Sequence, residues 1–477
     1  MAMNPKTRSL LSLLVLAALA LGAGLYAYYG VQVKQEKEKA AKERKEKLFP
    51  DLDKAKLTQL TVTAKGETTV LSRSKSTDPW SLVSPVTALA DKAAVDSLID
   101  RLASMRSKSV VEEKAADLKR YGLDPPSIKI VAKAEDGTEL VLRCGEENSF
   151  DSSVYVAMGG SNEVLSAEGG FKYALEKTTF DLRDKRLVPV EESEIAGIEV
   201  TAPGGRYQLA KEEGRWRIVQ PFADRADDQA VGKIVNAIRN LRATRFVTDT
   251  ASAPDLAKVG LDKPKAEATL SLTSGVKMAL EWSQISEPDK KTTYARRRDA
   301  TFIAEVPETI LAELDVKPAD LRDKSLLTFD KDQVAKATFT LSDGTLTVER
   351  KKPEGDAGRS EEWVVTAPSP GEAKKWKMSS VLWGLSSLKA ASIVEDKATD
   401  FAKYGLDKPS RSVTLFGSDG KELGTLSFGK EEADKVFARN AAEPRVFAVD
   451  KARLGELPAS RADLEEAKAA DGGTAKK

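Results

Sequence analysis

The chain has 477 residues, which is more than one hydrophobic core usually serves, so its length predicts about three domains. Its 75 Lys and Arg residues nearly balance its 74 Asp and Glu residues, and a net charge of +1 provides no basic field to attract a nucleic acid. The chain has no histidine, which excludes serine–histidine and cysteine–histidine catalysis and His-ligated metals.

The single cysteine, Cys144, excludes an intramolecular disulfide framework and a cysteine-cluster metal site. It lies in the strand-like run LVLRCGEEN, where we expect a small buried apolar residue and not a nucleophile. We predict no catalytic, cofactor-binding or metal-binding residues.

The N-terminal segment predicts a membrane anchor. A short tail, residues 1–9, is followed by the uncharged run Leu10–Tyr29, and such a run spans about 30 Å as a helix, enough to cross a bilayer. Small residues around Ala18 and Ala20 would suit a signal peptidase, but the run is too long for a typical signal core and lacks a convincing cleavage site. We therefore predict an uncleaved transmembrane helix at residues 10–29.

Residues 30–47 are predicted to form a charged helical stalk. The segment KQEKEKAAKERKEK has little apolar face, and i,i+4 pairs such as Glu38 with Lys42 support a helix that acts as a spacer. Its cations compete with Lys6 and Arg8 for the cytoplasmic side of the membrane. Because a very short N-terminal tail commonly stays inside while a large domain is exported, we expect the globular part outside the cytoplasm.

One pattern then occurs three times, and a tryptophan marks each copy. An apolar residue opens a helical pattern fifteen residues after each tryptophan and recurs at offsets 0, 3, 4, 7 and 10, which is one stripe of an amphipathic helix. Asp91 and Asp227 precede the first two helices as expected N-caps, whereas Lys374 takes that place in the third copy. The tryptophans are Trp80, Trp216 and Trp363, and the prolines five residues on are Pro85, Pro221 and Pro368.

The stretches RYGLDPPS, KVGLDKPK and KYGLDKPS form the second part of the pattern. We interpret each as a short helix that ends at a left-handed glycine, with the next leucine folded back onto it and a proline that prevents its continuation. An anion cradle built from the same glycines is the alternative, but the spacing of a phosphate loop is missing. The glycines are Gly122, Gly260 and Gly405, and the prolines are Pro126, Pro264 and Pro409.

Each copy closes with a strand and a short helix, and FDLRDKRLVP or ADLRDKSLLT leads into the next copy. We expect the pairs Arg183–Asp184 and Arg322–Asp323 to form salt bridges between copies or caps, and not a catalytic or ligand pair. The third version, SRADLEEA, lacks this arginine and lysine.

The fold class is therefore α+β, with three tandem homologous domains of mainly antiparallel sheet behind the anchor and the stalk. We expect each domain to own a core. The predicted boundaries are 48–186, 187–325 and 326–465, followed by a disordered tail at 466–477.

The tryptophan–proline strand, the amphipathic helix and the YGLD-x-P turn, behind one N-terminal membrane helix, resemble the bacterial family called domain of unknown function 4340. The resemblance covers residues 48 to 465 as three copies. It implies an envelope protein at the inner membrane, with an accessory role beside an ABC transporter of the gliding-motility type, and it supplies no catalytic residues.

We therefore predict a non-enzymatic scaffold or accessory subunit whose partners are the membrane and other envelope proteins. A cell-wall or carbohydrate-binding module is the alternative, with Trp282, Trp376 and Trp383 as candidates for surface contact because they do not recur between copies. An enzyme that uses carboxylates is a third possibility, but acidic stretches such as EEGRW and EEADK offer no pair of acids at a defensible spacing.

Overall fold

The computed structural model describes residues 47–351, 362–455 and 457–466, together with scattered residues between 16 and 35. Most of the predicted anchor and stalk, and the tail after residue 466, lie outside the described residues. Among the residues that are described, no helix is both long and apolar enough to cross a membrane.

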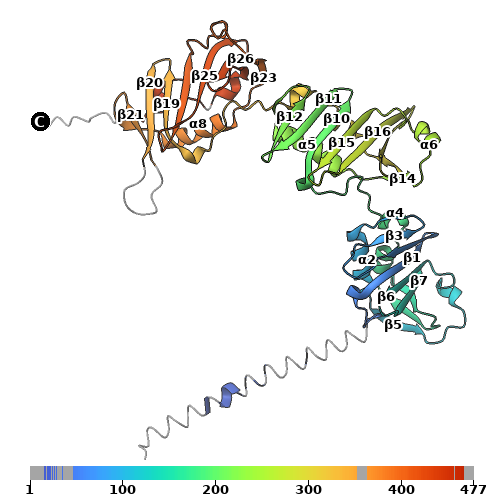
Figure 1. The fold of residues 1–477 in the computed structure, drawn as a ribbon. Coiled ribbons are helices and arrows are strands. Elements are labelled where there is room, and N and C mark those ends of the chain that lie inside the picture. Colours follow the sequence, from blue (N-terminus) through green and yellow to red (C-terminus); the bar gives the residue numbers. More distant parts are fainter. Residues whose placement is uncertain are drawn as a thin grey trace, which may run out of the picture. The chain divides into compact units, whose positions relative to one another are not determined.

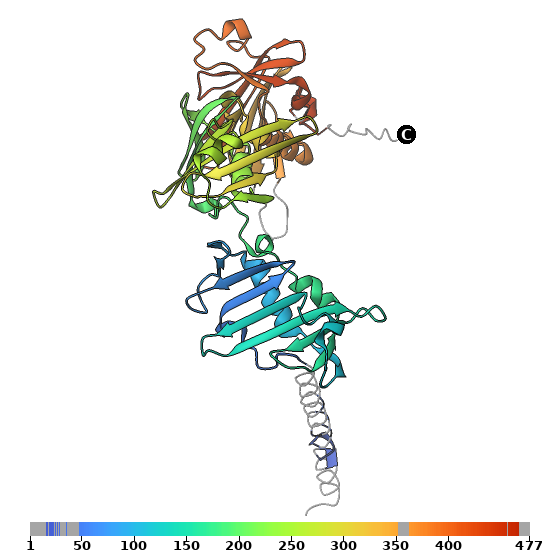
Figure 2. The same ribbon diagram turned by 90° about the vertical axis from the view of Figure 1, so that its right-hand side faces the viewer.

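Three nine-stranded sheets make up the fold, and all their strand pairs are antiparallel (Figure 1). The first sheet has the order β4-β3-β2-β1-β6-β7-β8-β9-β5, and the other two repeat this order position by position. Figure 2 shows the strands of the first sheet side by side. The sequence-based prediction of three tandem α+β domains is confirmed.

The strands of the first sheet are β1 Leu57–Ala64, β2 Glu67–Ser72, β3 Ser81–Ser84, β4 Ala88–Leu89, β5 Ser107–Glu112, β6 Ile128–Ala134, β7 Glu139–Glu147, β8 Val154–Met158 and β9 Val164–Ala167. Those of the second are β10 Ile195–Ala202, β11 Gly205–Glu212, β12 Arg215–Gln220, β13 Asp224–Arg225, β14 Arg245–Thr248, β15 Ala266–Leu272, β16 Lys277–Glu287, β17 Lys290–Arg297 and β18 Ile303–Val306. Those of the third are β19 Val334–Leu341, β20 Gly344–Lys351, β21 Glu362–Ala367, β22 Gly371–Glu372, β23 Ser392–Glu395, β24 Arg411–Gly417, β25 Glu422–Glu432, β26 Lys435–Asn440 and β27 Val446–Asp450.

One long helix accompanies each sheet: α2 Lys92–Ser104, α5 Asp228–Arg239 and α8 Lys375–Ser387. The shorter helices are α3 Gly170–Leu175, α4 Thr179–Leu182, α6 Ala253–Lys258 and α7 Thr309–Leu314. The contacts of the chain divide it into two compact units, residues 1–205 with 233–316 and residues 206–232 with 317–477. Every contact between copies that is described below lies within one unit.

The predicted helical stripe forms the inner side of each long helix. In α8, Met378, Val381, Leu382 and Leu385 are all buried, and they share one core with the inward residues of β19 and β24. The same core contains Trp363. Trp80 lies in the corresponding core of the first copy with the stripe of α2, and Trp216 is buried as well. Each Leu or Val buried in this way contributes roughly 1.5–3 kcal/mol of hydrophobic stabilisation.

The chain enters and leaves each copy at opposite ends of its long helix. Entry is fixed just past the helix C-terminus, where Leu48 N–H donates to the carbonyl of Met105 at 3.0 Å. Exit is fixed just before the helix N-terminus, where Asp91 N–H donates to the carbonyl of Leu182 at 2.8 Å. The other two copies repeat both bonds. In the second copy the N–H of Leu187 donates to the carbonyl of Leu241 at the entry, and the N–H of Asp227 donates to that of Leu321 at the exit. In the third copy the N–H of Leu326 donates to the carbonyl of Leu388, and the N–H of Lys374 donates to that of Leu464.

The glycine turns have the geometry that the sequence predicts. Gly122, Gly260 and Gly405 have φ values of 65°, 74° and 67°, in the left-handed region. In the first copy Leu123 N–H closes the turn on the carbonyl of Leu118 at 3.1 Å. Pro126, Pro264 and Pro409 follow these turns, and Pro85, Pro221 and Pro368 each follow a cis peptide bond.

Candidate functional site

The outward side of α8 carries two exposed tryptophans. Trp376 is 66% exposed and Trp383 is 58% exposed, although the opposite side of the same helix is buried in the core. They are seven positions apart, which is about 10 Å of rise along an α-helix and close to two full turns, so both indoles lie on one side. Trp376, Ser379, Ser380, Trp383 and Ser387 together form this surface, which we call the tryptophan face.

Small residues lie between the two indoles and just beyond Trp383, and the hydroxyls of Ser379 and Ser387 already have acceptors. Ser379 Oγ donates to the carbonyl of Lys375 at 3.3 Å, and Ser387 Oγ donates to the carbonyl of Trp383 at 2.8 Å. A hydroxyl that is satisfied by its own helix can be covered without leaving a polar group unpaired. A partner can therefore cover Ser379 and Ser387 at little polar cost.

The corresponding positions in the other two copies are not aromatic. The core stripe aligns Trp376 with Ala93 and Gln229, and it aligns Trp383 with Asp100 and Asn236. The inner stripe stays apolar in all three helices, whereas the outer side is charged in α2, polar in α5 and aromatic in α8. The tryptophan face is thus a feature of the third copy alone, and packing of the common fold does not require it.

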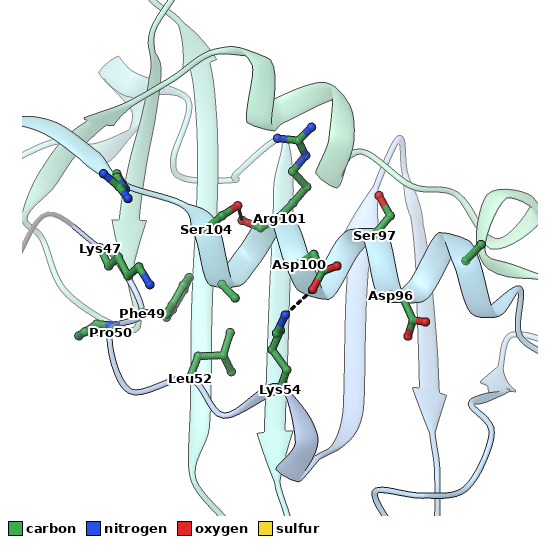
Figure 3. Close-up of a pocket in the computed structure, with 13 residues that line it drawn as sticks. Lys47, Phe49, Pro50, Leu52, Lys54, Asp96, Ser97, Asp100, Arg101 and Ser104 are labelled. Atoms are coloured by element: carbon green, nitrogen blue, oxygen red, sulfur yellow. Dashed lines mark hydrogen bonds and ion pairs between the residues drawn. The ribbon is translucent and has the colours of Figure 1, made fainter. Parts of the chain in front are cut away.

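The outer side of α2 borders a hollow of about 880 Å³ (Figure 3). Lys54 crosses it to Asp100 with an ion pair of 2.6 Å, and Phe49 and Leu52 lie below the helix. Asp96 on the same side pairs with Lys92 at 2.5 Å. Both carboxylates of the lining are therefore paired with a lysine, and the lining also includes the cations Lys47, Arg101 and Arg106.

The prediction that Trp282, the third candidate, lies at the surface is wrong. Its side chain is completely buried in β16, between Ala266 of β15 and Ala295 of β17. Four consecutive residues of β16, from Leu280 to Ser283, are buried, because residues on both sides of the strand are covered at this point. Of the three tryptophans predicted at the surface, only Trp376 and Trp383 are there.

Cys144 behaves as the sequence indicates. Burial raises the pKa of its thiol to about 12, with a small opposing effect of Lys172. The thiolate is therefore not accessible at neutral pH, and the residue packs as a small apolar side chain. Among the described residues, no group of three or more Asp, Glu or Cys side chains is placed to hold a metal ion.

The junction arginines contact the copy that follows them. Arg183 donates to Asp249 at 2.5 Å, and its guanidinium lies 3.4 Å from the ring centre of Phe246. Arg183 is itself buried, whereas the side chain of Asp249 is 35% exposed, so this pair is partly shielded from solvent. Its neighbour Asp184 accepts from Arg186.

Arg322 occupies the same position at the next junction, inside a cluster of alternating charges. It donates to Asp224 at 2.5 Å and also binds Asp396, which is the counterpart of Asp249. Arg445 completes the cluster, at 3.1 Å from both carboxylates. The predicted salt bridges between copies are therefore present for the two arginines, whereas Asp184 and Asp323 pair with Arg186 and Arg225 of their own copies.

The helix N-caps join the same junctions. Asp227 accepts from the N–H of Ala230 at 3.0 Å and also pairs with Lys389 of the third copy at 2.5 Å. Asp91 caps α2 in the same way, with Arg242 of the second copy 3.8 Å away. At the third cap Lys374 reverses the charge, and its ammonium donates to the carbonyl of Ala462 at 2.7 Å.

Sequence reasoning missed the acidic partners of these arginines. Asp249 and Asp396 each stand 33 positions after the tryptophan of their own copy, Trp216 or Trp363. That repeated spacing was a usable signal. Asp224 gave no such signal, because Ala88 and Gly371 stand at the matching positions of the other copies. Arg445 gave none either, because strand register aligns it with Phe302 of the second copy.

A family model described as Domain of unknown function (DUF4340) matches residues 80–249, 216–362 and 363–470. These matches begin at the three repeated tryptophans and cover most of the chain. The chain belongs to the DUF4340 family. No curated protein matches it.

The DUF4340 match does not coincide with one sheet. The match at 216–362 takes β12 to β18 from the second sheet and then β19 and β20 from the third. All three matches therefore start at the tryptophan strand, but only the middle one ends two strands into the next sheet, since the first runs on to β14. Strands β1 and β2, at residues 57–72, precede the first match although they belong to the first sheet.

Proposed function

We propose that this DUF4340 protein is a non-enzymatic interaction scaffold of the bacterial envelope, held in the inner membrane by the helix predicted at Leu10–Tyr29. Its globular copies lie outside the cytoplasm and bind other envelope proteins. An accessory role beside an ABC transporter, as the family resemblance implies, is the specific form of this proposal.

The observation that carries the proposal is the divergence of the three outward helix sides. The inner stripes of α2, α5 and α8 remain apolar because each must fill the same core. The outer sides are free of that requirement and have become charged, polar and aromatic. A chain that repeats one fold while varying one exposed surface presents three different binding surfaces in a fixed order.

Site-specific photo-crosslinking in the native membrane tests this function. A photoreactive residue is placed at Asp100, Asn236 or Trp383, which are equivalent positions on the three helices, and at Asp136 in a hairpin turn as a control. We expect at least one helix position to capture a defined protein that the Asp136 position does not. Capture of no protein at any of the three helix positions would refute the scaffold.

The carbohydrate-binding alternative draws on the same two exposed indoles, since aromatic rings can stack on sugars. It predicts that the full chain sediments with isolated peptidoglycan and that the double change Trp376→Ala and Trp383→Ala abolishes this sedimentation. The scaffold proposal predicts no such dependence.

A further inference from the structure

We propose that the tryptophan face of α8 binds a single amphipathic helix of a partner protein, with acidic residues at the end that meets the N-terminus of α8. This inference rests on the scaffold function proposed above and names the partner surface that it requires.

The shape of the face is the first argument. The two indoles stand about 10 Å apart along the axis, which is close to two helical turns. Ser379 and Ser380 lie between them, and both are small enough to let another backbone come close. Two large side chains at either end of a floor of small ones leave a slot on α8, in which the side-chain ridge of a partner helix that packs along α8 can sit.

The uncovered area is the second argument. At about 250 Å² for one tryptophan, the exposed fractions of 66% and 58% leave about 300 Å² of indole without cover. A standard interface takes about 800 Å² from each partner, and tryptophans dominate binding energy at such interfaces. The face therefore supplies more than a third of one side of a stable contact.

The hydrogen bonding of the α8 backbone favours a helix over a strand as the partner of the tryptophan face. Its N–H and C=O groups are engaged within the helix, so the face offers side chains and shape but no backbone edge to which a strand could be added. An amphipathic helix is recognised by side chains at helical spacing, which is what two tryptophans seven residues apart present.

Charge sets the direction of the partner. Lys375 is exposed beside Trp376, and it makes no ion pair among the residues that the structure describes. The positive end of the helix dipole adds to this charge, and the cap residue Lys374 does not neutralise it. At the other end Lys389 is already paired with Asp227. Carboxylates of the partner therefore belong near Lys375.

The test uses the full chain in its native membrane, with a photoreactive residue placed in turn at Trp376, Ser380, Trp383 and Ser387. We expect the photoreactive residue to capture the same protein from all four positions. Its captured residues should recur at spacings of three or four, with acidic residues near those captured from Trp376. Capture of lipid or of glycan, or partner residues at a spacing of two, would overturn the inference.

Ser380→Leu supplies a second readout, because it fills the middle of the slot without lowering helix propensity. We expect capture at Trp383 to fall about tenfold or more, as overpacking of an interface by one large side chain costs enough to do so. Ser97→Leu, at the equivalent position of α2, is the matched control and should leave capture unchanged. Undiminished capture in Ser380→Leu would refute the slot.

Lys375→Glu tests the charge argument in the same assay. It should weaken capture, while Lys92→Glu at the matching position of α2 should not. If Asp100 or Asn236 captures a protein and the tryptophan face captures none, the scaffold function survives and this inference fails. If no position captures a protein, the scaffold function itself fails.

Discussion

Trp282 and Trp383 show how one residue type takes opposite roles in this chain. Trp282 is fully enclosed, whereas Trp383 is mostly exposed on α8. Trp282→Ala should lower the free energy of unfolding by about 3–5 kcal/mol, because it leaves a large cavity. Trp383→Ala should change it by less than about 0.5 kcal/mol. Urea denaturation followed by circular dichroism measures both, and equal effects would contradict the assigned environments.

The three turn glycines should also differ from one another. A Cβ atom on Gly405 would lie 2.9 Å from the backbone nitrogen of Lys430, whereas one on Gly260 would meet nothing closer than 3.5 Å. Gly260→Ala therefore carries only the left-handed strain of about 1–2 kcal/mol. Gly405→Ala adds a clash with backbone and should cost about 2–4 kcal/mol.

Thermal denaturation of the two glycine variants beside the unchanged chain checks this order. The reason for the difference lies in the facing strand. Copies one and three have Gly145 and Gly429 there, packed against the turn, whereas the second copy has Ser283, which donates to the carbonyl of Val259 at 2.6 Å. A larger loss in Gly260→Ala than in Gly405→Ala would contradict the account.

At the scale of the element, the caps of the long helices are unequal. Asp91 accepts from the N–H of Ala94 at 3.1 Å, whereas Lys374 makes no side-chain cap for α8. Asp91→Ala should therefore cost about 1 kcal/mol, the usual effect of losing an N-cap. Asp91→Asn should cost much less, because asparagine caps equally well. Chemical denaturation that finds both changes equally harmful would show that the charge, and not the cap, matters.

The elements were predictable where their signal is local. The helical stripe and the glycine turn depend on residues within one or two turns of each other, so spacing alone located them. The order of the sheet depends on distant pairing, and no local pattern places β5 beside β9 at the edge of the sheet. For the same reason the sequence indicated Trp376 and Trp383 as surface residues but did not exclude Trp282, whose cover comes from neighbouring strands.

At the scale of the whole molecule, a fall in pH should weaken the contact between the second and third copies. Hydrogen bonds from Arg322 lower the pKa of Asp396. Burial alone would raise the pKa of Asp227, but the hydrogen bond from Lys389 helps to lower it overall. A carboxyl group with a lowered folded-state pKa stabilises fully above its unfolded pKa of about 4, and this contribution is lost as pH falls through the folded value.

Limited proteolysis between pH 7 and pH 3 with an acid-tolerant protease should therefore show faster cleavage between the second and third copies as the pH falls. Asp227→Asn keeps the cap but removes one titrating charge, so it should flatten this dependence. A cleavage rate that is independent of pH would contradict the role of these carboxylates.

Removal of Arg322 should weaken the contact between the second and third copies more than a fall in pH does. Arg322→Met leaves Asp224 and Asp396 with Arg445 as their only shared cation within the cluster. Breaking a buried pair by removing one partner costs about 3–5 kcal/mol, and the partial exposure of Asp396 places the expected loss near the lower end. Release of the third copy by protease, with the first two copies intact, checks this expectation.

The attachment of the chain to both ends of each long helix has a mechanical consequence. A pull along the chain enters a copy at the C-terminus of α2, through Leu48 and Met105, and leaves at its N-terminus, through Leu182 and Asp91. The load therefore passes along the helix and its core stripe before it reaches most of the strands. The same path recurs through α5 and α8, so a tethered array would meet tension with three helices in series, and Trp376 and Trp383 lie on the last of them.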